Sequence, residues 1–171
     1  MTRPDLADAL AHHVWATLGV IDTCLTLTPE QLATAVPGTY GSILATMRHI
    51  VGADAWDLFV FTGDRSGVGV EDTMDLGDLR VEMESHDSRW AGVLAQGLDP
   101  DTVLEEVDDD DGYRRSATVG IRFTGVLHHG TDHRSQICTA ITALGIKPPS
   151  IDAVDYGLEV GRVSEVYPDG R

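Results

Sequence analysis

Apolar residues recur at steps of three and four along most of the chain, a spacing that predicts amphipathic α-helices. The first such segment covers residues 4–27, and its apolar positions are Leu6, Leu10, Val14, Leu18, Ile21 and Leu25. Similar stripes predict long helices over residues 42–61, 75–97 and 118–144. Because no convincing strand pair accompanies these four segments, the pattern predicts an all-α protein built as a four-helix bundle.

Residues typical of helix ends bound the predicted segments. Thr28-Pro29-Glu30-Gln31 has the form of a capping box with proline in the first turn, and it predicts a short connecting helix before Pro37-Gly38. Ser42 is the expected cap of the second long helix, and Gly145 with the following Pro148-Pro149 ends the last one. These signals support the helix boundaries independently of the apolar stripes.

Other segments do not follow the helical pattern. Residues 63–69 form a glycine-rich loop, and residues 103–107 are compatible with a short extended piece. Four aspartates follow at 108–111, but the closing glutamate of an EF-hand is missing, so we interpret this run as a solvated turn. A C-terminal tail after Ser150 is expected to pack on the bundle or on a second subunit through Tyr156, Leu158, Val160 and Val163.

Length and composition predict one soluble domain over residues 1–171. Twelve basic residues stand against 28 acidic ones, giving a formal charge of −16, so nucleic acid and anionic membranes are not expected partners. Cys24 and Cys138 lie in apolar contexts and are interpreted as small buried hydrophobes rather than a disulfide. The chain has neither a secretory apolar region nor a run long enough to span a bilayer, which predicts a cytoplasmic protein.

The candidate chemistry lies in the last predicted helix, where His129 and His133 are four residues apart. A helix places both on one face, from which two imidazoles can bind one metal ion. His49, in the middle of the second long helix, is the best candidate for a third ligand. Three neutral imidazoles and an open coordination position suit a catalytic divalent metal. The competing interpretation is that these histidines are ordinary surface or core residues with hydrogen-bond partners.

Residues near the histidines leave further alternatives open. Arg134 could neutralise a substrate carboxylate or phosphate, although a salt bridge to the acidic surface is the favoured interpretation. Asp132 could orient a ligating imidazole, and Cys138 should point away from the site. His12 and His13 are expected to be solvated or core residues, with one of them facing the site as the alternative, and the charged neighbours of His86 suggest that it is exposed.

The segment His129-Gly130-Thr131-Asp132-His133-Arg134-Ser135-Gln136-Ile137, with Leu144-Gly145 after it, resembles the last helix of the DinB/YfiT-like metalloprotein family. The family pattern has a histidine, a second histidine four residues later followed by arginine, and then a glutamine. Gly41-Ser42-Ile43 leading to Met47-Arg48-His49 agrees with the second helix, and the resemblance extends over nearly the whole chain. Ser135 stands where a glycine is often found, a change of one small residue for another.

This resemblance implies a four-helix bundle, often a homodimer, with a divalent metal held by His49, His129 and His133. Nickel or zinc is the usual metal, and iron or manganese is an alternative. It also implies a relationship to thiol-dependent transferases and isomerases that use mycothiol, bacillithiol or glutathione as a co-substrate. In such enzymes the metal binds the thiol as a thiolate and presents a nucleophile at neutral pH.

Three functional hypotheses follow. The first is a metal-dependent enzyme, most plausibly a thiol S-transferase or isomerase acting on a small electrophile, with a hydrolase as the variant in which water takes the open coordination position. The second is a non-catalytic, metal-binding stress-response module in which the ion ties two helices together. The third is a purely structural bundle whose histidines are core residues. The catalytic and co-substrate-binding residues are not identified by the sequence.

Overall fold

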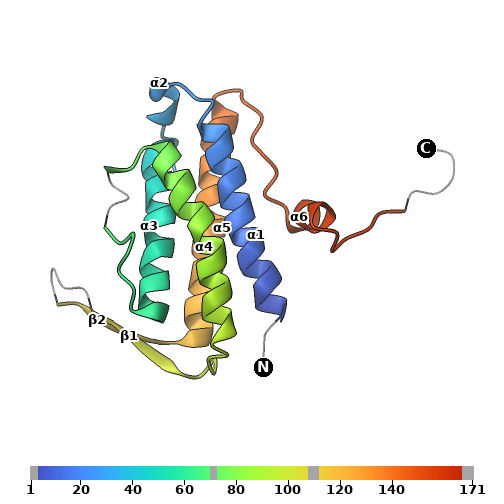
Figure 1. Cartoon of the computed structure of the whole chain (residues 1–171). Helices are drawn as coiled ribbons and strands as arrows, with labels where there is room; N and C mark the ends of the chain where they lie inside the picture. The colour runs from blue at the N-terminus through green and yellow to red at the C-terminus, as the bar shows by residue number, and fades with distance from the viewer. Residues whose placement is uncertain (1–3, 70–72, 108–111, 167–171) are drawn as a thin grey trace.

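Four long helices lie side by side and form the body of the protein in this computed structural model (Figure 1). The structure describes residues 4–69, 73–107 and 112–166. The long helices are α1 (Pro4–Cys24), α3 (Ile43–Thr62), α4 (Leu76–Ala95) and α5 (Val119–Ala143), and shorter elements connect or follow them: α2 (Pro29–Leu32), β1 (Val103–Val107), β2 (Arg114–Thr118) and α6 (Ala153–Glu159). The predicted all-α bundle with a short connecting helix is confirmed.

The helix starts agree with the signals in the sequence. Thr28 and Gln31 form the predicted capping box at the start of α2, and the Ser42 side chain accepts a hydrogen bond from the Ala45 amide at the start of α3. Asp75 and Thr118 cap α4 and α5 in the same way. Each cap satisfies an amide that the first helical turn leaves without a partner, which fixes where the helix begins.

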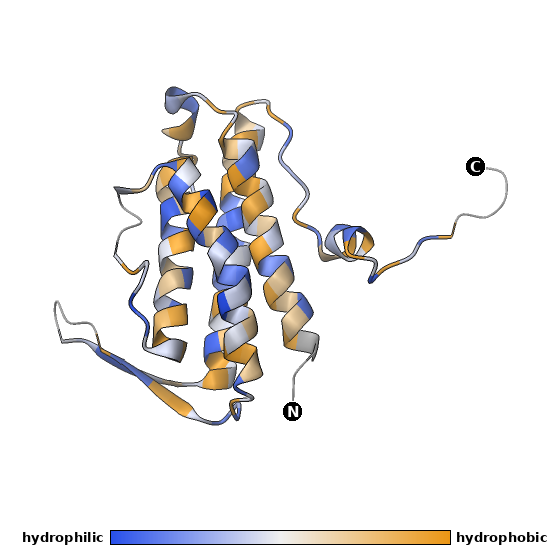
Figure 2. Ribbon diagram, viewed as in Figure 1, coloured by the Kyte–Doolittle hydropathy of each residue, from blue (hydrophilic) through white to orange (hydrophobic). Residues whose placement is uncertain are grey.

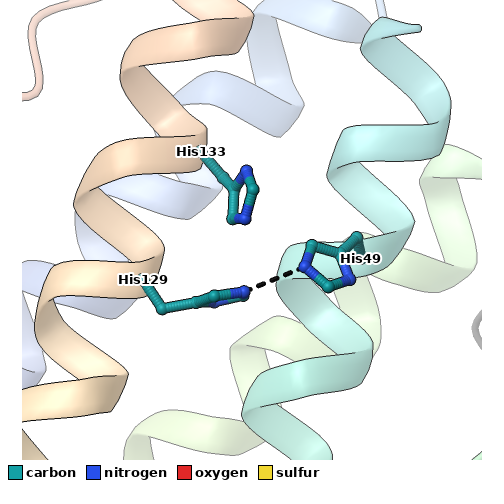
Figure 3. A group of neighbouring side chains, drawn as sticks. All are labelled: His49, His129 and His133. Atoms are coloured by element: carbon teal, nitrogen blue, oxygen red, sulfur yellow. Dashed lines mark hydrogen bonds between the residues drawn. The ribbon is translucent and has the colours of Figure 1, made fainter. Parts of the chain in front are cut away.

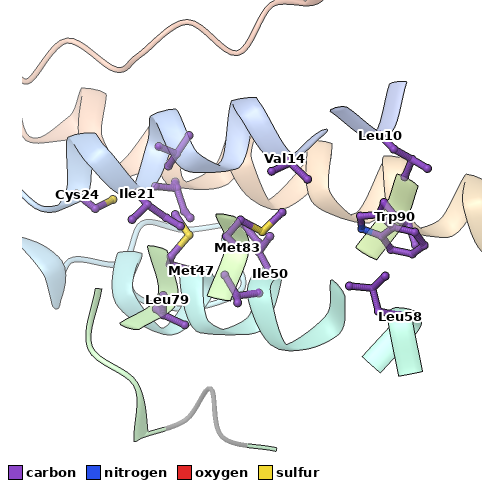
Figure 4. Packing of buried hydrophobic residues seen from close by; sticks show 14 of the residues in the cluster. Leu10, Val14, Ile21, Cys24, Met47, Ile50, Leu58, Leu79, Met83 and Trp90 are labelled. Carbon is purple, nitrogen blue, oxygen red and sulfur yellow. The ribbon is translucent and has the colours of Figure 1, made fainter. Parts of the chain in front are cut away.

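The core lies between the four long helices, where their apolar stripes face one another (Figures 2 and 4). It contains most of the residues expected from the periodicity, because helices bury the stripe that repeats every three to four residues. The largest fully buried apolar side chains are Leu10, Ile21, Ile43, Met47, Ile50, Leu58, Leu79, Met83, Trp90, Ile137 and Ile141.

A two-stranded antiparallel hairpin precedes α5, so the prediction that the chain has no strand pair is wrong. Residues 103–107, expected to be extended, form β1, which pairs with β2 in a register that sets Glu106 opposite Arg115. The two strands do not show the alternating apolar pattern of a half-buried strand, and charged contacts stabilise the hairpin instead. Glu106 is buried and forms ion pairs with both Arg115 and Arg122. The aspartate run at 108–111 lies outside the described residues.

The C-terminal tail packs on α1 through α6, in agreement with one of its two predicted alternatives, but Leu158 and Val160, two of its four predicted anchors, are exposed. The Tyr156 ring lies 5.6–5.7 Å from the rings of Trp15 and His12. The Trp15 indole donates a hydrogen bond to Glu159, and His12 Nε2 lies 3.0 Å from the Ile151 carbonyl oxygen. These contacts hold the tail on the outer side of α1, away from α3 and α4 (Figure 1).

A chain of polar contacts crosses the apolar core and joins all four long helices; we call Arg134, His13, Asp54, His86 and Glu82 the polar row. Arg134 Nη1 lies 2.9 Å from His13 Nδ1, and His13 Nε2 lies 3.1 Å from Asp54 Oδ1. The other Asp54 oxygen contacts His86 Nδ1 at 2.6 Å, and His86 Nε2 lies 3.1 Å from Glu82 Oε1. All members except Glu82 are at least 97% buried.

The partners in the polar row define the protonation state of each histidine. The guanidinium of Arg134 can only donate, so His13 Nδ1 accepts, and its Nε2–H donates to Asp54. His86 faces a carboxylate oxygen at both ring nitrogens and therefore carries two protons. Its pKa is raised because hydrogen bonds and charges of Asp54 and Glu82 outweigh desolvation, and the two histidines hold the pKa of Asp54 well below its usual range.

Two sequence expectations are corrected by this arrangement. His86 was expected to be exposed but is completely buried, because it occupies the core-facing stripe of α4 between Met83 and Trp90. Arg134 was expected to pair with the acidic surface but is 1% exposed and bonded to His13 and Thr17. Hydrogen-bond partners on the neighbouring helices compensate for the burial of both side chains.

Candidate metal centre

His49, His129 and His133 converge on one point between α3 and α5 (Figure 3). One nitrogen from each ring lies within 4.8 Å of those of the other two, and all three side chains are partly buried. The closest pair is His49 Nε2 and His129 Nε2, which are 2.9 Å apart. The structure thus brings together the three residues that the sequence indicated.

The position of the histidines follows from helix geometry. His129 and His133 are one turn apart on α5, so both rings leave the same face of the helix. α3 packs directly against α5, and His49 lies near the middle of α3 facing this pair. Gly130, beside His129, allows α5 to approach α1: a Cβ there would lie 2.4 Å from His13 Cε1.

Two residues that the sequence reasoning did not single out orient the imidazoles. Gln136 Oε1 accepts a hydrogen bond from the Tyr40 amide and lies 3.1 Å from His133 Nδ1. Because this oxygen accepts, His133 Nδ1 carries the proton, and its Nε2 lone pair is available to a metal. The Tyr40 ring also stacks on His49, with the ring centroids 4.1 Å apart. Gln136 was visible in the family motif, whereas Tyr40 had no signal in the sequence.

The electrostatics of the site favour neutral imidazoles. Burial lowers the pKa of His49, and the neighbouring His133 lowers it further. Burial together with His133 and His49 lowers the pKa of His129 to about 4. Protonated imidazoles so close together would repel one another, so the fold disfavours the charged forms. Neutral rings expose the lone pairs that metal ions require.

The donor set fits a divalent transition metal or zinc. Two nitrogens bound to one zinc ion at ~2.0–2.1 Å lie roughly 3.3–4 Å apart. The observed separations, from the 2.9 Å contact to the 4.8 Å limit, bracket this range. Two ring nitrogens in such close contact need a proton or a cation between them, and three imidazoles leave a coordination position for another ligand. The three-histidine group could therefore hold a divalent metal.

Other residues considered from the sequence lie outside this group. Asp132 is exposed, and the oxygen near the His133 ring belongs to Gln136, so Gln136 rather than Asp132 orients His133. His13 is a core residue of the polar row, as expected. Cys24 is buried and both cysteines are free, in agreement with their interpretation as hydrophobes. Burial raises the pKa of Cys24 to about 12, which keeps it a thiol.

A cavity of about 1030 Å³ opens beside the histidines and includes His49 and His129 in its wall. α3, α5, the hairpin and the loop after α3 form its sides. Its charged lining residues are Arg48, Arg65, Arg115, Arg122, Asp57 and Glu106. The cavity is large enough for a small organic molecule beside the histidine group.

Asp57 is the carboxylate of this cavity whose protonation is most strongly altered. Burial raises its pKa to about 7, and the nearby charge of Asp54 acts in the same direction. Its closest cation is Arg122, whose Nη1 lies 4.0 Å away and is bound more tightly by Glu106 at 2.9 Å. Asp57 can therefore exchange a proton near neutral pH, a property that sequence reasoning missed because it depends on burial.

The model of the DinB family matches residues 1–159. The chain belongs to the DinB family. No curated protein matches the sequence. In this DinB-family protein two histidines of α5 and one of α3 converge, and Gln136 contacts His133. Among the described residues of the DinB chain, none of the helices has the length and apolar character needed to cross a membrane.

Proposed function

We propose that this DinB-family protein binds one divalent metal ion through His49, His129 and His133 and is a metal-dependent enzyme. The reaction proposed is the addition or transfer of a low-molecular-weight thiol, such as mycothiol or bacillithiol, to a small electrophile, or a thiol-assisted isomerisation. Nickel and zinc are the first candidate metals, and iron and manganese the next. The observation that carries this proposal is the convergence of three neutral imidazoles in the wall of a cavity.

The residues of the chain supply orientation and a group that can exchange a proton. When bound, the metal would supply Lewis acidity that stabilises a thiolate at neutral pH. Gln136 holds His133 in the tautomer that leaves Nε2 free, and Tyr40 packs on His49 and limits the rotation of its ring. Asp57, with its pKa near 7, is the candidate to accept or return a proton in the cavity.

Metal content tests the first part of the proposal. The wild-type protein, loaded with nickel or zinc and desalted, is expected to retain close to one equivalent by elemental mass spectrometry. His49→Ala, His129→Ala and His133→Ala should each lose most of it. His12→Ala is the matched control, since His12 contacts the tail rather than the site. Wild-type protein without metal after loading would return the three histidines to a structural role.

Thiol chemistry tests the second part. Metal-loaded protein should consume a low-molecular-weight thiol in the presence of electrophiles faster than protein treated with a chelator. Equal, slow consumption across a broad electrophile panel would contradict the enzyme proposal. A large fall in melting temperature on chelation, without turnover of any thiol, would favour the non-catalytic metal-binding module.

The state of assembly belongs to the same proposal. We propose that the protein is a homodimer, as the family resemblance implies, and that it acts in the cytoplasm. Light scattering at several concentrations gives the molar mass directly, and a value of one 18.4 kDa chain at all of them would contradict the dimer.

A further inference from the structure

The basic residues of this acidic protein are concentrated at the cavity beside the histidines. Among the residues that the structure describes, four basic residues line the cavity, whereas two acidic residues do. The four are Arg48, Arg65, Arg115 and Arg122. With both carboxylates ionised, the described part of the lining still carries a net positive charge inside a protein whose formal charge is −16. Such a local reversal of charge attracts an anion to one place and repels it elsewhere.

The partners of Arg48, Arg115 and Arg122 leave part of the positive charge of these three side chains uncompensated. Arg48 donates two hydrogen bonds to the Met74 carbonyl oxygen, a neutral partner. Arg115 and Arg122 share one carboxylate, since Glu106 Oε1 lies 3.1 Å from Arg115 and Oε2 lies 2.9 Å from Arg122. Asp57, the other carboxylate, lies 4.0 Å from Arg122 and is half protonated near pH 7.

Arg122 and Arg115 have different roles at this wall. The Arg122 side chain is 4% exposed and is held in place by its ion pair with Glu106. Its Nε has no hydrogen-bond partner among the described residues. The Arg115 side chain is 59% exposed on the hairpin and can contact a molecule in the cavity. A guanidinium presents paired N–H donors that match the two oxygens of a carboxylate.

We propose that the molecule that reacts at the histidine centre carries a carboxylate, and that Arg115 is the specificity-determining residue that binds it. This inference rests on the proposed function and adds the charge of the substrate to it. The hairpin thereby acquires a function: it carries Arg115 and the buried Glu106, which positions the guanidinium, in the wall of the cavity. The Trp56 indole also holds Glu106, because its N–H donates a hydrogen bond of 3.1 Å to Glu106 Oε2.

The test uses matched thiols and protein loaded with Co(II), whose absorption spectrum changes when a thiolate binds. The probes are 3-mercaptopropionate and 6-mercaptohexanoate, each compared with its neutral amide. The readout is the Kd of the amide thiol for the protein divided by the Kd of the corresponding acid thiol. Attraction between the acid and the metal contributes to this ratio in every variant, so the difference between variants isolates the arginine.

Arg115→Gln is the informative variant and Arg114→Gln its control. Both remove one positive charge from β2, but neighbouring strand residues point to opposite faces, and Arg114 does not line the cavity. We expect Arg115→Gln to weaken binding of at least one acid about tenfold, the effect of a charged hydrogen bond, and to leave the amides unchanged. Arg114→Gln should behave like the wild type. Equal ratios in all three proteins at both chain lengths would overturn the proposal.

A second measurement separates this inference from the proposed thiol function. Metal-free protein is titrated with glutarate and with glutaramide, and the indole N–H signal of Trp56 is followed by NMR, since this group lies in the cavity wall beside Glu106. Glutarate should shift the signal in the wild type and in Arg114→Gln with a similar Kd. In Arg115→Gln the Kd should be at least tenfold higher. If cobalt binds no thiol but glutarate binds as expected, only the proposed function fails. If thiols bind but glutarate and glutaramide act equally, and the thiol ratios agree, only the carboxylate inference fails.

Discussion

The polar row predicts that two aspartates only three residues apart on α3 respond in opposite ways to the same substitution. Asp54 is 3% exposed and accepts hydrogen bonds from His13, His86 and Trp90. Asp54→Asn places an amide N–H₂ against a donor, whichever way the side chain turns. His13 cannot switch tautomer to accept it, because Arg134 donates to its other nitrogen.

The size of the effect follows from burial. Removing one partner of a buried ion pair costs ~3–5 kcal/mol, because the buried charge that remains, here on His86, keeps only Glu82 as a counter-charge. A protein of this length loses about 2–4 °C of melting temperature per kcal/mol, so Asp54→Asn should lower the melting temperature by roughly 6–20 °C. Urea unfolding at pH 6, followed by circular dichroism, measures the change in the free energy of unfolding at constant slope.

Asp57→Asn is the matched control, and its expected effect has the opposite sign. The pKa of Asp57 is raised from 3.8 to about 7, so between these pH values the unfolded chain releases a proton that the folded protein keeps, and stability falls as pH rises through this window and stays low above it. Asp57→Asn should therefore equal or exceed the wild type in stability at pH 8 and differ least from it near pH 4. The reasoning would be refuted if Asp54→Asn stayed within about 1 kcal/mol of the wild type, the size of an ordinary hydrogen bond. A loss in Asp57→Asn as large as in Asp54→Asn would refute it equally.

Two further outcomes are expected. Gly130→Ala should destabilise the protein by ~1–3 kcal/mol, because its Cβ would lie 2.4 Å from a buried atom of His13. Gly125→Ala, with open space around it on the same helix, should be neutral or stabilising. Thermal unfolding of both variants checks this. The stability difference between wild type and Asp54→Asn should be largest between about pH 4 and 6.5. The Asp54 contribution is present above its unfolded pKa of 3.8 and is lost as pH falls through its lowered folded value, and the His86 contribution is full below 6.5 and lost as pH rises through its raised folded value. Urea unfolding from pH 4 to 9 tests this window, and a difference independent of pH would contradict it.

The helices and the histidine group could be predicted from the sequence because both depend on local spacing. The apolar steps defined four stripes, and the predicted cap at Ser42 matched the start of α3. His129 and His133 share a face by helix geometry alone. His49 was the best remaining candidate for a third ligand, but its place opposite this pair depends on the packing of α3 on α5, for which the family motif was the only support in the sequence.

The polar row and the hairpin escaped prediction for different reasons. His86 was judged by its charged neighbours in sequence, although it falls on the core stripe of Leu79, Met83, Trp90 and Val93, and this spacing was the available signal. The hairpin had no such signal, because Glu106 and its arginine partners hold it through long-range ion pairs. Long-range pairs of this kind leave no periodicity in the sequence.

The alternation of residues on α5 has a consequence for how the protein can change. Gly130 and Arg134, each directly after a site histidine, lock α5 against α1, whereas His129 and His133 face α3. Sliding α5 by one turn would move it ~5.4 Å and break the Arg134 contacts, so the register of the helix is set by the polar row, independently of any ion. Each of the three histidines can therefore be replaced by another metal-ligating residue without changing the packing of the helices that orient the other two. Substitution in the polar row, which touches no ligand, would instead disturb all three together.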